Sequence, residues 1–152
     1  MTGGHWRLFV ELVEEYQGQR SVELDSQTVH TGSQTDTRLC IFSRPYVAED
    51  KDHVASCAFD VQSDITVQDI INLVLTNNRD KYVLSEAGSG SRFWCETVIA
   101  DLEANGWIAK TSYQIAREYA HRLARANPGF IPLEGPKGTF YQVSARSQQA
   151  LG

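Results

Sequence analysis

Polar and apolar residues alternate at the start of the chain in the manner of paired strands. In residues 6–13 (WRLFVELV), Trp6, Leu8 and Val10 occupy every second position, which is the period of a strand with one well-buried face. The alternation resumes at residues 21–25 after a polar stretch, and Gly18 in that stretch suits a turn. The two segments therefore predict a β-hairpin.

Four further segments have the pattern of strands. Residues 38–42 (RLCIF) and 54–61 (VASCAFDV) are the longer ones, and a loop containing Pro45 separates them. Shorter strands are predicted at residues 82–84 and, near the end of the chain, at 138–143. The first half of the chain is thus predicted to be mostly β.

A helical spacing of three and four residues replaces the alternation later in the chain. The first predicted helix begins after Thr66, whose hydroxyl can cap the first turn while Asp69 stands at the third helical position. Its apolar stripe ends at the Asn77-Asn78 pair.

Two more helices are predicted. One begins near Phe93 and ends at the Asn105-Gly106 pair. The other covers residues 112–126 and stops before Pro128, because the residue preceding a proline disfavours helical geometry. The residues of this last helix predicted to face inward are Ile115, Ala116, Tyr119, Ala120 and Leu123.

The order of these elements predicts the fold class. A hairpin, further strands, three helices and a closing strand indicate an α+β protein, with an antiparallel sheet packed against about three helices. A chain of 152 residues with 41% hydrophobic content is long enough for one core and too short to favour two. We therefore expect a single domain covering residues 1–152.

The composition argues against several classes of function. A net charge of −5, with scattered Lys and Arg, disfavours nucleic-acid binding. The longest strongly apolar stretch, residues 70–75, is far shorter than the roughly 20 residues that span a bilayer, and the N-terminus has no secretory signal pattern. Three cysteines without a CxxC pair indicate free thiols in a reducing compartment. We expect a cytoplasmic protein that binds neither nucleic acid nor membranes.

Metal and cofactor motifs are not found in the sequence. The four histidines are dispersed and have none of the spacings typical of zinc sites. The glycines of residues 88–91 lack the lysine of a phosphate-binding loop and the spacing of a dinucleotide fingerprint. No metal and no cofactor are expected.

The stretch GSGSRFWC, residues 88–95, has the clearest chemical potential. It places a flexible loop before a helix, and a helix N-terminus supplies free amides and partial positive charge that stabilise an oxyanion or a thiolate. Ser89 or Ser91 is the predicted N-cap. Cys95 shares the apolar face of the same helix, so we predict a buried, unreactive thiol.

Together with this helix start, the strand that begins His5-Trp6 resembles the circularly permuted papain-like proteins of the lecithin-retinol acyltransferase and NlpC/P60 group. In that group the histidine is the general base and the helix begins with a nucleophilic cysteine. The resemblance implies a permuted papain-like topology with His5 as base. Ser91 stands where the group has cysteine, and Cys95 lies one turn further in. A degenerate hydrolase or acyltransferase using Ser91 or Cys95 with His5 is therefore one hypothesis.

The chain as a whole also resembles a family of small fungal proteins. The segments that carry this second resemblance are HWRLFVEL near the start, RFWCETVIADLE in the middle and GTFY near the end. By analogy with fungal proteins of this size, it implies a role in secondary metabolism.

Aromatic residues outnumber what the strands and helices need, which suits a pocket for an apolar small molecule. They are Trp6, Phe93, Trp94, Trp107, Phe140 and Tyr141. We expect a small-molecule enzyme of the cyclase or isomerase type that uses a general acid or base and no covalent nucleophile. The predicted catalytic residues are His5, Ser91 and Arg92, and the predicted substrate-binding residues are Trp6, Trp94 and Tyr141.

Two alternatives to this enzyme remain open. One is the hydrolase or acyltransferase described above, and the other is a non-catalytic binding or interaction module. The spare aromatic residues would also suit a homodimer interface.

Overall fold

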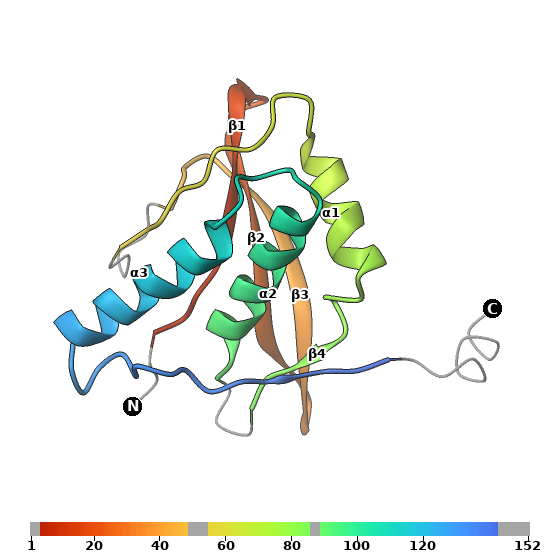
Figure 1. Cartoon of the computed structure of the whole chain (residues 1–152). Helices are drawn as coiled ribbons and strands as arrows, with labels where there is room; N and C mark the ends of the chain where they lie inside the picture. Colours follow the sequence, from red (N-terminus) through yellow and green to blue (C-terminus); the bar gives the residue numbers. More distant parts are fainter. Residues whose placement is uncertain (1–3, 49–54, 86–88, 143–152) are drawn as a thin grey trace.

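The computed structural model, which describes residues 4–48, 55–85 and 89–142, has an α+β architecture as predicted (Figure 1). Strands β1, β2 and β3 form an antiparallel sheet in that order, and β4 pairs with β5 in a second, two-stranded sheet. The elements in chain order are β1 (Leu8–Tyr16), β2 (Gln19–Thr31), β3 (Gln34–Arg44), α1 (Val67–Thr76), β4 (Tyr82–Val83), α2 (Ser91–Ala104), α3 (Ser112–Ala126) and β5 (Thr139–Phe140).

The predicted hairpin is confirmed, and its register follows from the alternation. Leu8 lies opposite Leu24 and Val10 opposite Val22. Gln17 and Gly18 form the two-residue turn, and their φ angles of 51° and 79° are both positive, as expected of a turn that matches the twist of its strands. The strand predicted at residues 38–42 is also present within the longer β3, which pairs with β2 without a break in register.

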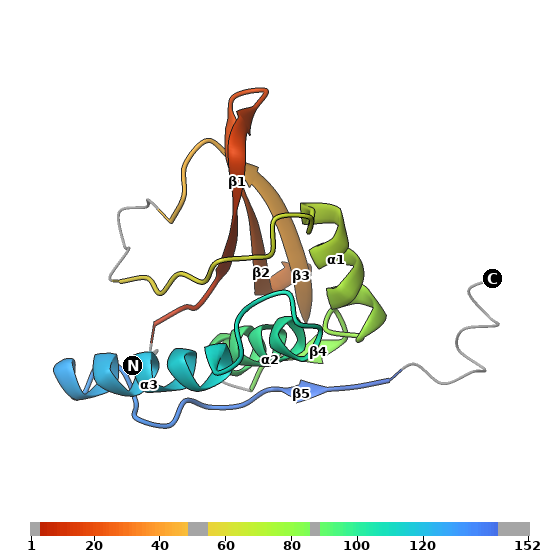
Figure 2. The same ribbon diagram turned by 45° about the horizontal axis from the view of Figure 1, so that its top comes forward.

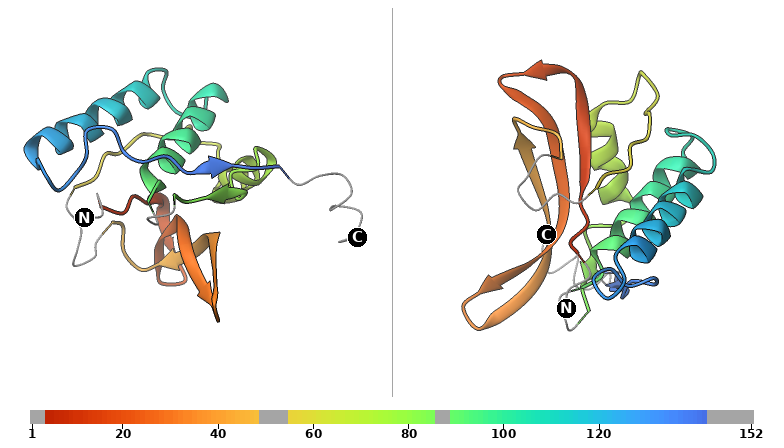
Figure 3. Two further views of the ribbon diagram at one scale, coloured as in Figure 1. Left: turned by 90° about the horizontal axis from the view of Figure 1, so that it is seen from below. Right: turned by 90° about the vertical axis from the view of Figure 1, so that its left-hand side faces the viewer.

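The three helices lie on one side of the larger sheet (Figure 3), and α2 and α3 run side by side (Figure 2). Apolar side chains of the sheet, such as Leu24 and Leu39, pack with those of the helices in one core. Helix α2 lies at the centre and is buried on nearly all sides, as expected of an interior helix. Its buried residues are Ser91, Arg92, Trp94, Cys95, Glu96, Val98, Ile99 and Leu102.

Two of the predicted helices match the structure closely. Thr66 caps α1 in a reciprocal capping box with Asp69, and α3 covers the predicted residues. The prediction that Ile115 faces inward is wrong, since this residue is 44% exposed. The buried stripe of α3 advances in steps of four residues, through Ser112, Ala116, Ala120 and Ala124, and this leaves Ile115 on the outer side.

The strand predicted at residues 54–61 is wrong over residues 55–61, which are described and form no strand; residue 54 lies outside the described residues. Alternation alone does not make a strand, because a strand also needs a partner along its edge. The predicted strand at 82–84 ends at Val83, because the Leu84 amide donates to the Thr37 hydroxyl. The closing strand is reduced to Thr139–Phe140, its described partner β4 being equally short; residue 143 is not described.

No helix within the described ranges is long and apolar enough to span a bilayer.

Candidate functional site

Helix α2 begins without a side-chain cap, contrary to the prediction that Ser89 or Ser91 caps it. Its N-cap is Gly90, whose φ of 126° is a conformation that only glycine adopts readily. Side-chain bulk is excluded there as well: a Cβ on Gly90 would lie 2.8 Å from both Gly138 N and the Tyr82 hydroxyl. Tertiary contacts therefore fix the start of this helix.

The Tyr82 hydroxyl joins three segments at this point. It donates to the Gly90 carbonyl at 2.7 Å and accepts from the Gly138 amide at 2.8 Å. The ring itself is buried and packs on Phe140, with ring centroids 4.5 Å apart. The loop before α2 and the segment before β5 are thus held to β4 by one side chain.

Ser91, the first residue of α2, contacts the segment that precedes β1. Its Oγ accepts a hydrogen bond from the Trp6 amide at 3.0 Å, and the residue is only 5% exposed. This bond joins segments that are far apart in sequence and places Ser91 beside the peptide that links His5 to Trp6. The structure therefore brings together two of the three residues that the sequence predicts to be catalytic.

His5 forms a close pair with a buried carboxylate. Its Nε2 donates to Asp25 Oδ1 at 2.5 Å, and Asp25 is 1% exposed whereas the His5 side chain is 44% exposed. Gln27 Nε2 donates to the other oxygen, Oδ2, also at 2.5 Å. With its proton on Nε2, a neutral His5 ring carries a free lone pair on Nδ1, so the pair has the arrangement of a histidine base oriented by a carboxylate.

A small pocket lies at the start of α2. Its interior measures about 20 Å³, which is enough for one water-sized group. Gly4 and Trp6 line it on either side of His5 in the sequence, but His5 is not among the lining residues. The other lining residues are Ser89, Gly90, Ser91, Arg92, Pro132, Gly135 and Pro136.

Arg92 also lines the pocket, and most of its donors are in use. Its side chain is 8% exposed, and Nε donates to Glu96 Oε1 at 2.8 Å. Nη1 donates to the carbonyls of Pro132 and Leu133, both at 3.1 Å. Nη2 makes no hydrogen bond to any residue that the structure describes. Arg92 therefore anchors a chain segment and retains one donor group for another acceptor.

The predicted aromatic wall is only partly realised. Trp6 lines the pocket, and the Arg92 guanidinium lies 5.9 Å from its ring centre. Trp94 instead is fully buried in the core, with its indole donating to the Arg79 carbonyl at 2.7 Å. Tyr141 follows β5, with its amide bonded to the Lys81 carbonyl, and is not among the lining residues. Neither Trp94 nor Tyr141 is placed to contact a molecule in this pocket.

Cys95 is buried, as predicted. Burial raises the pKa of its thiol well above the ordinary value, and the nearby Asp25 and Glu96 carboxylates raise this pKa further. A thiol in such surroundings stays protonated and is a poor nucleophile. Among the described residues, no three His, Cys, Asp or Glu side chains converge as a metal site requires.

Three residues of this region were not predicted as part of a site: Asp25, Gln27 and Tyr82. The hairpin contains a signal for the first two, because residues that alternate with the core positions of paired strands share a face and become neighbours. Once Leu8 is placed opposite Leu24, the strand extension brings His5 near Asp25 and Gln27. The Tyr82 contacts have no such local signal.

The chain belongs to the family described as a domain of unknown function (DUF7770), whose model matches residues 2–141. No curated protein and no solved structure matches the chain significantly.

Proposed function

We propose that this protein is a small-molecule enzyme of the cyclase or isomerase type, in which His5 transfers protons and no covalent intermediate forms. The observation that carries the proposal is the 2.5 Å bond between His5 Nε2 and the buried Asp25 carboxylate. A carboxylate in that position orients the imidazole, which favours general base catalysis. The exposure of His5 leaves its ring accessible to a bound molecule.

The neighbouring groups suit the charge that such a reaction develops. Removal of a proton from carbon next to a carbonyl leaves negative charge on the carbonyl oxygen, and the proton moves to His5 Nδ1. Arg92 Nη2 and the Ser91 hydroxyl hydrogen are donors beside the pocket that can stabilise this oxygen. The pocket admits one small group, so the rest of the substrate would lie outside it.

An apolar substrate fits the surroundings of the pocket. The side chains of Trp6, Pro132 and Pro136 supply apolar surface at its walls. Together with the resemblance to small fungal proteins, this favours a substrate from secondary metabolism.

Solvent hydrogen exchange tests the proposal without knowledge of the natural substrate. Wild-type protein is incubated in D₂O with a panel of ketones and β,γ-unsaturated ketones, and deuterium incorporation and double-bond migration are followed by NMR. We expect His5→Gln, which can still donate to Asp25, to lower the catalysed rate by roughly a hundredfold. His30→Gln is the matched control, because His30 is an exposed histidine that contacts Thr35 near the turn between β2 and β3. Equal rates for His5→Gln and wild type, or no catalysis with any probe, would contradict the proposal.

A second candidate is a hydrolase or acyltransferase with a permuted papain-like arrangement, in which Ser91 is the nucleophile. The bond between the Trp6 amide and Ser91 Oγ favours it, because it brings the serine next to the His5–Asp25 pair. The low exposure of Ser91 and the lack of a hydrogen bond from it to His5 argue against it. Labelling by a fluorophosphonate probe, located by mass spectrometry and lost in Ser91→Ala, would establish this candidate instead of the first.

A further inference from the structure

A segment of the chain after α3 forms one wall of the pocket. The two ends of this segment are held more firmly than its middle. We call residues 131–138 the strap; in the view of Figure 2 it runs below α3 and α2 toward β5. At one end Ile131 is buried, and its amide bonds to the Asn127 carbonyl at 3.1 Å. At the other end Gly138 is held by the Tyr82 hydroxyl and leads directly into β5.

Polar contacts hold the middle of the strap. The side chains of Pro132, Leu133, Pro136 and Lys137 are all exposed, so little apolar surface is buried there. Arg92 binds two carbonyls, as described above. Glu134 supplies a second attachment, with its carboxylate 3.3 Å from Arg117 Nη2 and 2.9 Å from His121 Nε2. Lys137 Nζ also lies 5.0 Å from the Phe93 ring centre.

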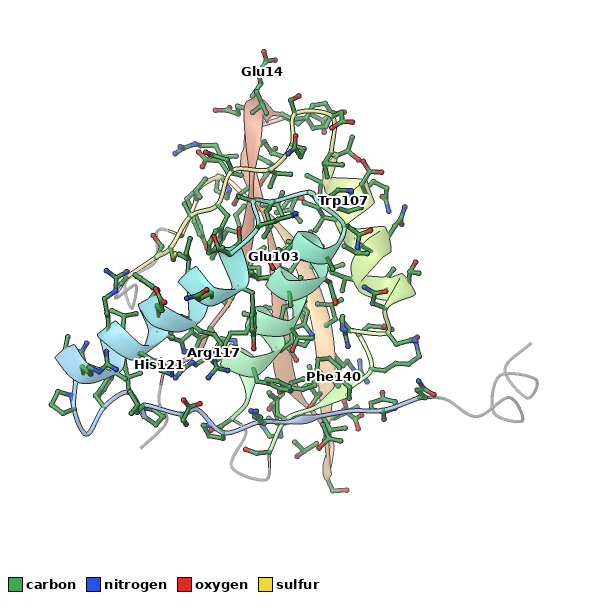
Figure 4. All side chains as sticks on the ribbon, viewed as in Figure 1. Glu14, Glu103, Trp107, Arg117, His121 and Phe140 are labelled. Atoms are coloured by element: carbon green, nitrogen blue, oxygen red, sulfur yellow. The ribbon has the colours of Figure 1, made fainter. Side chains whose placement is uncertain are left out.

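The Glu134 attachment is at the surface. Arg117 and His121 lie on the edge of α3 that faces the strap (Figure 4). The Glu134 side chain is 62% exposed, and its pKa is lowered mainly by the hydrogen bond from His121 and further by Arg117. Exposed ion pairs are individually weak and are screened by salt. Such an attachment breaks and reforms easily.

The strap also limits the size of the pocket. Pro132, Gly135 and Pro136 of the strap form one wall, and the space inside is about 20 Å³. Sites for small organic molecules usually measure roughly 300–1,000 Å³. A substrate that places more than one small group at the start of α2 therefore requires the strap to move.

We propose that the strap is a gate over this pocket, with Glu134 as the latch that closes it on Arg117 and His121. The role of the gate, which is to admit substrate, rests on the proposed function. The local opening of the strap does not depend on which reaction the protein catalyses. Segments of this kind, with few apolar contacts between firm ends, open locally without unfolding of the whole domain.

Amide hydrogen exchange on the protein alone tests the gate. In Glu134→Gln the latch loses its charge, and we expect the Ile131 and Gly138 amides, which are the hydrogen-bonded amides of the strap, to exchange about five-fold faster than in wild type. Glu118→Gln is the matched control, since Glu118 is an exposed glutamate of α3 whose described hydrogen bond is with Gln114. In about 1 M salt, wild type should approach the exchange rate of Glu134→Gln. Equal strap exchange in Glu134→Gln and Glu118→Gln would overturn the proposal.

Tryptophan quenching tests whether movement of the strap opens the pocket. Of the three tryptophans, Trp94 is fully buried and Trp107 can be replaced by Phe, which leaves Trp6 as the responsive residue at the pocket. We expect acrylamide to quench Trp6 at least about twofold more strongly when Glu134 is Gln. Faster strap exchange without a change in quenching would contradict the gate. If both readouts change while the D₂O assay shows no catalysis, the gate stands and the proposed reaction falls.

Discussion

Helices α1 and α2 begin in opposite ways. Helix α1 is capped from within, because Thr66 accepts from the Asp69 amide and Asp69 in turn accepts from the Thr66 amide. Helix α2 has a glycine N-cap, no side-chain cap and no acidic residue in its first turn. Its first residue, Ser91, uses its hydroxyl to accept from the distant Trp6 amide.

The start of α1 stabilises only its own helix, whereas the start of α2 brings together the residues of the candidate site. The self-contained start of α1 needs no partner and is largely exposed. The start of α2 is buried, and the segment before β1 and the strap both contact it. Helix α3 is intermediate, since Glu103 of α2 accepts from its Tyr113 amide and so caps it from outside. The first backbone amides of a helix can donate hydrogen bonds to other groups when no nearby side chain accepts from them.

The burial of α2 predicts the largest effect, which is a difference in thiol reactivity. We expect iodoacetamide at neutral pH to modify the partly exposed Cys40 and Cys57 at least roughly a thousandfold faster than Cys95, which reacts only when the core opens. Peptide mass spectrometry of samples quenched at successive times measures the three rates. In denaturant all three thiols should react alike. Rapid modification of Cys95 in the native protein would show that the first turns of α2 are open to solvent.

Substitution of the α2 N-cap should have the next largest effect. We expect Gly90→Ala to lower the free energy of unfolding by roughly 3 kcal/mol, because alanine is strained at a φ of 126° and its Cβ meets Gly138 and Tyr82. Urea unfolding measures the change. Gly106→Ala is the control: its φ is also positive, at 72°, but nothing lies within 4 Å of the added Cβ, so we expect a loss of only about 1 kcal/mol. Equal losses for the two variants would mean that the contacts around Gly90 contribute little.

Removal of the α1 cap should have the smallest effect. Thr66→Ala is expected to lower the free energy of unfolding by about 1 kcal/mol while the D₂O exchange activity at His5 stays unchanged.

The cap also depends on pH: hydrogen bonds from the Thr66 backbone and side chain lower the pKa of Asp69 below 3.8. Its stabilisation is therefore present above that pH and is lost as the pH falls through the lowered pKa. The stability difference between wild type and Asp69→Asn should shrink over the same range, and a constant difference would argue against this ionic contribution.

The same contrast explains how much could be predicted from the sequence. The capping pair of α1, the limits of α3 and the hairpin depend on residues close together in the chain, and all three were predicted. The N-cap of α2 was predicted as serine because serine is the usual local solution. Contacts with Tyr82 and Gly138 decided the outcome in favour of glycine, and no local pattern reports them.

The candidate site shows the same division. His5, Ser91 and Arg92 were singled out by their positions at a strand start and a helix start. Their partners Asp25 and Pro132 come from other elements and depend on strand register and on the path of the strap. Trp94 was assigned to a pocket wall because the aromatic residues outnumber what the strands and helices need. Helical spacing places Trp94 four and eight residues before Val98 and Leu102, on the buried stripe of α2, and its ring lies in the core.

The bond between Trp6 and Ser91 has a consequence for how the protein is made. Its two residues are separated by 85 positions, and the pocket wall extends to Pro136. The hairpin, whose contacts are local, can pair soon after its residues leave the ribosome, but the pocket also needs the strap, which is synthesised much later. A nascent chain that stops before the strap therefore has the histidine and its carboxylate and lacks the enclosure around them. The chemistry proposed for His5 becomes available only after the strap has been synthesised.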